Sequence, residues 1–493
     1  MAVIHFLWRL INVQRSPLRT VPGPLLAKFT DLWYFWNVRQ GSFEQTNLQL
    51  HSTYGNVVRY GPGRYSLKGP DAVKSIYGLG RPFPKSSWYS TWASPGQWSI
   101  FGDQDVHRHA KNRRCYQATY AMSALVHYEG FVDQCSDLFV QRLGEMAKSN
   151  IPIDLGHWFQ CYAFDVIGMI TYGTRLGFLD NGDDIGGVIA ALESHLAYAT
   201  LVGIYPGLHQ YLFPLKNFWA GAKGAGRAYV LHFTKERIRE AQTAPKAVSP
   251  RPEVGTEDFL TKFLAKQASD PGVFTPYHVL AGCTSNMVAG SDTTAISLSA
   301  VLYHLMKNPA TLEKLRHEID CCAVQGQLSK SPTFKESQDM PYLQAVIKES
   351  LRMHPATGLP LERVVPKGGA TISDHFFPEG SIVGINTWVA HRDPSIFGED
   401  ANTFRPERWL IQDGEKLSSM NRQWMPFGLG SRTCIGRHVS VLEMSKLIPR
   451  IIRDFDFSLS SDLKSHEWLT RNFWFVKPIN FTVHADTRDR GRE

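Results

Sequence analysis

The sequence has few cysteines, no internal repeat and no long low-complexity segment. Seven cysteines in 493 residues are too few and too scattered for a disulfide scaffold, and their odd number leaves at least one unpaired. We therefore expect the protein in a reducing compartment. Hydrophobic residues make up 43% and charged residues 20%, which excludes a disordered or fibrous chain.

A strong excess of charge is also missing. Lys and Arg number 53 against 45 Asp and Glu, which gives a formal net charge of +8, mild for a chain of this length. Such an excess suits an acidic protein partner or an anionic membrane surface. It is too diffuse to predict nucleic-acid binding, so we expect no nucleic-acid partner.

The N-terminus lacks a hydrophobic run long enough to span a bilayer. Residues 1–10 are apolar, but a spanning helix needs roughly 18 or more apolar residues, and three early arginines interrupt any extension. No small-residue cleavage site of a secretory signal follows. The segment is either a frayed end or an interfacial anchor, with Phe6, Leu7 and Trp8 in lipid. Residues 1–20 are thus predicted as a short segment whose membrane contact, if any, is peripheral.

Helical periodicity dominates the sequence, and strand-like segments are few and short. Helices are predicted around 105–147, 156–172, 184–200, 220–241, 256–268, 311–324 and 340–353. Strands are predicted at 55–60 and 65–68, around a turn at 61–63, and at 370–373 and 381–386, around a turn at 378–380. The proline-rich segment 243–255 predicts an exposed loop. The pattern indicates a mostly α protein with small sheets.

One apolar helix carries polar residues at its centre. Thr275-Pro276 predicts its start, and the pattern continues to Asn308, which gives a length of roughly 48 Å. Its centre, residues 289–294, reads AGSDTT. A carboxylate inside such a helix is costly unless it is paired or functional. Asp292 therefore either makes a local ion pair, while the threonines bond back to carbonyls, or has a chemical role.

A glycine-rich loop, FGLGSRTCIG at 427–436, holds a single cysteine. Its glycines permit tight turns and the close approach of a flat ligand. A helical pattern follows, so Cys434 lies at a helix N-terminus, where the dipole and free N–H groups favour the thiolate. A thiolate among backbone donors is a good iron ligand, and Arg432 is placed to bind a carboxylate beside it. An isolated cysteine is usually a small buried hydrophobe, but this pattern of fixed residues at fixed spacing arises by chance with a probability on the order of 10⁻⁵.

The loop matches every fixed position of FxxGxRxCxG, the haem-binding pattern of the cytochromes P-450, and the chain resembles that family. Further matches are the oxygen-binding motif at 289–294, the ExxR motif at 349–352, and the meander motif at 404–409, which ends in Trp where Phe is more common. Order and spacing agree with the family from about residue 20 to residue 485. The resemblance implies a single catalytic domain at 21–485, mainly α with small β-sheets (α+β), and a polar tail at 486–493.

The resemblance also implies structural roles. Glu349 and Arg352 lie at i and i+3 on one helix face, and with Arg408 they would form the family's buried salt-bridge triad, which supports the haem loop. Taken alone, an ExxR pair more often marks a surface ion pair.

Haem b is the implied cofactor, with Cys434 as the axial ligand of its iron. The residues implied to hold the haem and its propionates are Arg432, His109, Arg113, Arg363, Phe427, Gly428, Gly436 and Gly290. His109 stands where the family usually has tryptophan. The basic helix around 108–114 is alternatively a solvated face or a docking patch for an acidic reductase, which is compatible with propionate binding.

The implied reaction inserts one atom of O2 into an apolar molecule, with the axial thiolate favouring O–O cleavage. Asp292 and Thr293 suit proton delivery, and Gly290 is expected to leave room above the iron. The chain has no evident flavin or nicotinamide motif, so electrons are expected from a separate NADPH–cytochrome P-450 reductase. Two alternatives remain: an isomerase or dehydratase that needs no electrons, and a non-catalytic haem sensor. The Asp292-Thr293 pair argues against both.

The sequence predicts only the general class of the substrate. Aromatic and apolar residues near the expected pocket indicate a bulky apolar molecule, although each is also explained by core packing; they are Trp88, Tyr89, Trp92, Trp98, Leu359, Phe473 and Trp474. Several phrases, FRPERW and HRDPSIFG among them, look like fungal members of the pisatin-demethylase type, which implies secondary metabolism. Location at the cytosolic face of the endoplasmic reticulum is implied by the family alone.

Overall fold

The computed structural model describes residues 16–80, 83–149, 151–224, 227–243, 257–460, 463 and 467–488. The helices are α2 (Leu32–Arg39), α3 (Phe43–Tyr54), α4 (Pro70–Tyr77), α5 (Val106–Gln117), α6 (Met122–Leu125), α7 (Glu129–Ser149), α8 (Leu155–Tyr172), α9 (Phe178–Asn181), α10 (Val188–Val202), α11 (His209–Gly224), α12 (Arg227–Thr243), α13 (Phe259–Ser269), α14 (Pro276–Lys307), α15 (Pro309–Val324), α16 (Phe334–Gln338), α17 (Pro341–Met353), α18 (Thr387–Ala390), α19 (Pro394–Phe397), α20 (Gly414–Gln423) and α21 (Arg437–Asp454). Short 3-10 helices are η1 (Leu26–Lys28), η2 (Ser87–Trp92), η3 (Val126–Tyr128), η4 (Ile185–Gly187), η5 (Pro206–Leu208), η6 (Pro406–Trp409) and η7 (Gly430–Arg432). The proposed N-terminal anchor and almost all of the 243–255 loop lie outside the described residues.

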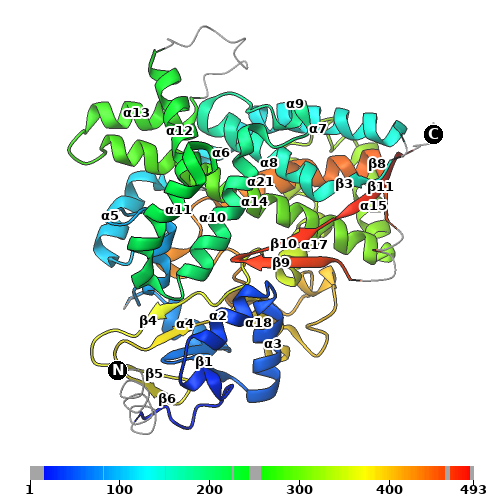
Figure 1. Cartoon of the computed structure of the whole chain (residues 1–493). Helices are drawn as coiled ribbons and strands as arrows, with labels where there is room; N and C mark the ends of the chain where they lie inside the picture. Colours follow the sequence, from blue (N-terminus) through cyan, green and yellow to red (C-terminus); the bar gives the residue numbers. More distant parts are fainter. Residues whose placement is uncertain are drawn as a thin grey trace.

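The strands form small separate sheets, as the sequence predicted. They are β1 (Val57–Gly61), β2 (Arg64–Leu67), β3 (Ile153–Asp154), β4 (Arg363–Val364), β5 (Ala370–Ile372), β6 (His375–Phe377), β7 (Ile382–Gly384), β8 (Phe455–Leu459), β9 (Leu469–Phe473), β10 (Phe475–Ile479) and β11 (Thr482–Thr487). Their orders are β1-β2-β7-β4, β3-β11-β8, β10-β9 and β5-β6. Figure 1 shows the largest of these sheets at the N-terminal end of the molecule and the long helices above it.

The predicted hairpin around residues 61–63 is confirmed, with Val57 opposite Leu67. The second predicted pair is wrong in its pairing. β5 pairs with β6 through a turn at Ser373 and Asp374, which have φ of 48° and 63°, and two positive φ values suit the twist of a tight hairpin. β7 instead lies parallel to β2.

Some predicted helices are divided in the structure. The pattern at 105–147 corresponds to α5, α6 and α7, because the chain changes direction at 118–128, where Leu125 and Tyr128 turn into the core. The pattern at 220–241 falls on the end of α11 and on α12, and residues 225 and 226 between them lie outside the described part of the chain. Periodicity continues across 118–128, so it did not reveal the change of direction there.

Helix α14 runs through the middle of the helical part, packed against α8, α17 and α21 (Figure 1). The predicted start is confirmed: the Thr275 side chain and His278 form a capping box, and Pro276 is the first residue. A Cβ on Gly290 would lie 2.9 Å from Cγ1 of Ile167, a residue of α8. Gly290 therefore has a packing reason to be glycine, because α8 lies close to it, and its expected place above a haem stays a prediction.

The hydrophobic core has two main parts. One surrounds α7, α8, α14, α17 and α21. The other surrounds the β1-β2-β7-β4 sheet and reaches α14 through Ile296. At the C-terminus, β11 continues through Thr487, and Arg488 pairs with Asp320 at 2.6 Å, so the first residues of the predicted polar tail are part of the folded chain.

Candidate active site

Cys434 lies in the turn between η7 and α21, as the loop pattern predicted. Its backbone N–H donates to the carbonyl of Phe427 at 2.8 Å, which closes the loop. Gly428 and Gly430 have φ of 68° and 66°. A Cβ at Gly430 would collide with the carbonyl oxygen of Tyr77. These glycines therefore have conformational and steric reasons to be there.

The thiol of Cys434 is accessible, yet protein surrounds it closely enough to alter its ionisation. Burial raises its pKa, while hydrogen bonds from the N–H groups of Gly436 and Arg437 and the charge of Arg113 oppose that rise. The helix N-terminus thus favours the thiolate, as predicted, but does not outweigh burial. A bound iron ion would supply the missing charge and displace the proton.

The centre of α14 is accessible although the helix is mostly buried. Ala289 is exposed, and Gly290 and Thr293 are half-buried, while the residues of the following two turns, 294–302, are buried. A helix that crosses the core shows such a face only where it borders a hollow. The Thr293 hydroxyl donates to the carbonyl of Ala289 at 2.7 Å.

Basic side chains gather near the loop: Lys85, His109, Arg113, Arg363 and Arg432. Burial, then the positive charges of Arg432 and Lys85, lower the pKa of His109 to about 3. Burial, then Arg363, lowers the pKa of Arg432 to about 10. Among the described residues, Arg432 Nη2 has no hydrogen-bond partner. The positive charge of the cluster is therefore available to an anionic ligand.

The carboxylate of Asp103 opposes the lowering of the pKa of Arg432 but does not neutralise the cluster. Asp103 is bonded by two nitrogens of Arg108, each at 2.8 Å. Arg432 reaches only the backbone oxygen of Asp103, also at 2.8 Å. The basic cluster therefore suits a ligand with two carboxylates of its own.

Lys85 was missed by sequence reasoning. It lies far from every motif, and an isolated β-bridge to Arg363 brings it into the cluster. Burial, then Arg363, lowers its pKa well below the usual value. No local signal in the sequence indicates this position.

The arrangement fits iron protoporphyrin IX. It combines an accessible thiol at a helix N-terminus, an accessible face on a core helix, and unneutralised cations for two propionates. Gly436 leaves open space beside Cys434, since nothing lies within 4 Å of a Cβ placed there. The surroundings of Cys434, Arg432 and the accessible face of α14 are thus suitable for haem, and the individual haem contacts stay predictions.

The predicted salt-bridge triad is present and buried. Arg352 donates to Glu349 at 2.7 and 2.8 Å, and Arg408 donates to the same carboxylate at 2.8 Å. Trp409 Nε1 donates to Glu349 Oε2 at 2.9 Å, a bond that the more common Phe cannot make. Arg352 also bonds the carbonyl of Ala401. The triad ties α17 to the segment that precedes the cysteine loop.

Arg352→Met is expected to destabilise the fold by about 3–5 kcal/mol, because it removes one of the two arginines that pair with the buried carboxylate of Glu349. Thermal unfolding and haem content measure the loss. Trp409→Phe is the matched control: it removes a single hydrogen bond to the same carboxylate and should cost only about 1 kcal/mol. If the two variants lost the same free energy of unfolding, the salt-bridge triad would not be the main stabilising contact of Glu349.

Asp292 has partners from other elements. Its Oδ1 accepts a hydrogen bond from Gln160 of α8 and lies 3.4 Å from Nζ of Lys477 in β10. Oδ2 accepts none among the described residues. The structural interpretation of this motif is confirmed in part: Thr293 bonds back to Ala289, but the ion pair of Asp292 is with Lys477 of another element and is not local. A chemical role for the pair is compatible with it and stays a prediction.

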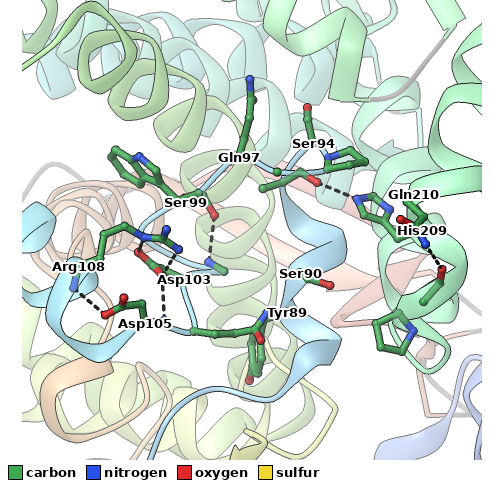
Figure 2. Close-up of a pocket in the computed structure, with 18 residues that line it drawn as sticks. Tyr89, Ser90, Ser94, Gln97, Ser99, Asp103, Asp105, Arg108, His209 and Gln210 are labelled. Carbon is green, nitrogen blue, oxygen red and sulfur yellow. Dashed lines mark hydrogen bonds and ion pairs between the residues drawn. The ribbon is translucent and has the colours of Figure 1, made fainter.

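A cavity of about 620 Å³ lies between η2, the following loop and η5. Figure 2 shows the side chain of Arg108 directed to Asp103, the backbone N–H of Arg108 donating to Asp105, and His209 bonded to the neighbouring segment. Among the aromatic residues expected at the substrate pocket, Tyr89 and Trp98 line this cavity. Because Asp103 also bonds Arg432, the cavity borders the basic cluster.

The other expected pocket residues are packed in the interior. Trp474 lies 4.9 Å from Trp88 and 5.8 Å from Trp92, measured between ring centroids, and all three are buried. Leu359 is buried and Phe473 half-buried. These contacts form one aromatic cluster between η2 and the β9–β10 hairpin.

Comparison with known proteins agrees with the geometry. The model of the Cytochrome P-450 family matches residues 26–481. Pisatin demethylase of Fusarium vanettenii is 37% identical over 477 residues, which cover 96% of this chain and 90% of that protein. A cytochrome P-450 monooxygenase of Aspergillus terreus is 38% identical over 459 residues, covering 91% and 92%. The cytochrome P-450 monooxygenase cicH of Emericella nidulans is 36% identical over 484 residues, covering 96% and 95%. The chain therefore belongs to the cytochrome P-450 family.

Proposed function

We propose that residues 21–485 act as one haem-thiolate monooxygenase domain, with Cys434 as the axial ligand. Membership of the family makes the chain an oxidoreductase that incorporates molecular oxygen. The observation that carries the residue assignment is the accessible Cys434 thiol beside a basic cluster with spare positive charge. Arg113, Arg363, Arg432 and His109 hold the propionates, and Phe427, Gly428 and Gly436 shape the loop.

A haem held through the Cys434 thiolate would supply the oxygen activation. The chain's own part is to deliver protons without flooding the site with water. Asp292 holds and releases a proton at its carboxylate, and Thr293 donates through its hydroxyl toward the accessible face of α14. In the resting structure that hydroxyl donates to the carbonyl of Ala289, so it has to turn to act.

Electrons come from a separate partner in this proposal, an NADPH–cytochrome P-450 reductase. Exposed basic residues of α5, Arg108, Lys111 and Arg114, support docking of an acidic partner. Consumption of NADPH only when the reductase is present separates this function from the isomerase, dehydratase and sensor alternatives.

The substrate class is a bulky apolar small molecule of fungal secondary metabolism. The relatives support it: one is a pisatin demethylase, and others are fungal cytochrome P-450 monooxygenases. The test is incubation of the protein and reductase with an extract of the producing organism, followed by mass spectrometry for products heavier by one oxygen.

Peripheral contact with the cytosolic face of the endoplasmic reticulum completes the proposal. Residues 185–202 are long and apolar enough to span a membrane, but 44% of the stretch is buried, and packing of Leu192 and Leu196 in the core explains its apolarity. Helix α11 instead exposes a row of apolar side chains: Tyr211 (69%), Leu215 (51%), Phe218 (78%) and Trp219 (78%). Such a face suits the membrane interface.

Alkaline extraction of membranes from expressing cells is therefore expected to release the protein into the supernatant, because peripheral contacts do not survive it. Phe218→Ser with Trp219→Ser should lower the fraction that sediments with membranes before extraction, since it removes exposed apolar area without touching the core. Retention in the alkaline pellet would contradict a peripheral attachment.

A further inference from the structure

Three charged residues from three elements form a row that leads from the surface to α14. Glu193 of α10, Lys477 of β10 and Asp292 of α14 have side chains that are 55%, 22% and 1% exposed. Nζ of Lys477 lies 2.7 Å from Glu193 Oε1 and 3.4 Å from Asp292 Oδ1. One ammonium group thus connects an exposed carboxylate with a buried one.

Among the described residues, Lys477 is the only cation paired with Asp292. The other group that bonds the carboxylate, Gln160 of α8, is neutral, and Oδ2 accepts no hydrogen bond. An ionised carboxylate buried against neutral groups alone is strongly disfavoured. The charge of Asp292 therefore depends on Lys477.

Hydrogen bonds fix the backbone around Lys477, and two carboxylates hold its ammonium group. Lys477 lies in the β9–β10 hairpin, opposite Arg471. The hairpin is bonded to the segment after α17: Gly358 N–H donates to the carbonyl of Trp474 at 2.9 Å, and Val476 N–H donates to that of Ala356 at 2.8 Å. Burial lowers the pKa of Lys477, but Asp292 and Glu193 outweigh burial and raise it overall.

We propose that Lys477 is a positioning residue for oxygen activation: it keeps Asp292 ionised and directed, and Glu193 holds Lys477 from the solvent side. The inference rests on the proposed proton-delivery role of Asp292. A carboxylate that stayed protonated, or turned away to find another partner, would no longer be ready to collect a proton from solvent. The role acts through Asp292, so it requires no contact between Lys477 and haem or substrate.

The test uses the full-length haem protein, reduced and bound to carbon monoxide, whose C–O stretching frequency responds to nearby charge and needs no substrate. In the wild type we expect one frequency from pH 6 to pH 9. Lys477→Met should make the frequency move with pH in this range, as the buried carboxyl takes up and releases a proton. Lys477→Arg keeps the cation and should restore the wild-type pattern. If Lys477→Met does not fold, Lys477→Gln removes the same charge.

Two further variants separate the possible failures. Arg488→Met removes another paired cation, the partner of Asp320, and should leave the frequency unchanged. Asp292→Asn should shift it at every pH. If Asp292→Asn shifts it while Lys477→Met matches the wild type throughout, the positioning role is wrong and the role of Asp292 stands. If neither changes it, the proposed role of Asp292 fails as well.

Discussion

Cys434→Ala is expected to abolish the thiolate-type Soret band of the reduced carbon monoxide complex and all NADPH-dependent oxygenation. The axial ligand supplies the electron density that favours O–O cleavage, and alanine has no donor atom. The backbone of the loop should persist, because the bond from the Cys434 N–H to the Phe427 carbonyl involves no side chain. We therefore expect a folded protein with little or weakly held haem.

A matched control comes from the other cysteines. All seven are free among the described residues, and Cys115 and Cys321 are half-buried and remote from the loop in sequence. Cys115→Ala and Cys321→Ala should leave the spectrum unchanged, which separates loss of the ligand from loss of any thiol. An unchanged Soret band in Cys434→Ala would overturn the ligand assignment.

The parts of the site that the sequence predicted depend on local signals. The loop around Cys434 is specified by glycines and a helix start within ten residues, and α14 by a capping Thr275 followed by Pro276. Glu349 and Arg352 lie one turn apart on one helix. Their partner Arg408 became predictable only through the family resemblance, because it comes from another segment.

The parts that the sequence did not predict depend on long-range packing. Lys85 reaches the basic cluster through a β-bridge to Arg363, and Lys477 reaches Asp292 from a hairpin 185 residues away. The close packing of Gly290 against α8 was not predicted either, since periodicity shows that a face is crowded but not which helix crowds it. Likewise, β5 has a hairpin turn without the glycine or proline that usually marks one.

Thr293→Ala and Asp292→Asn are expected to keep haem and fold but to lose product by about 10²–10⁴-fold, because a positioned proton donor contributes that much where one is needed. Thr293→Ala removes only a hydroxyl that bonds back to Ala289, and alanine is a good helix former. Asp292→Asn keeps the size of the side chain and one acceptor oxygen, and it removes the group that carries the proton.

The two variants should differ in how they fail. Thr293→Ala should still consume NADPH but release more of the oxygen as hydrogen peroxide, since oxygen is reduced but protonated at the wrong place. Product, peroxide and NADPH measured together decide between this role and a purely structural one, which predicts loss of haem or a lower melting temperature with unchanged product per NADPH. The ion pair of Asp292 and the back-bonded hydroxyl of Thr293 are both present, and they agree with a proton-relay role as well as with a purely structural one. The amount of product formed per NADPH consumed distinguishes the two roles. If Thr293→Ala forms as much product per NADPH consumed as the wild type, Asp292 and Thr293 are not a proton relay. The electron-independent alternatives would then be favoured again.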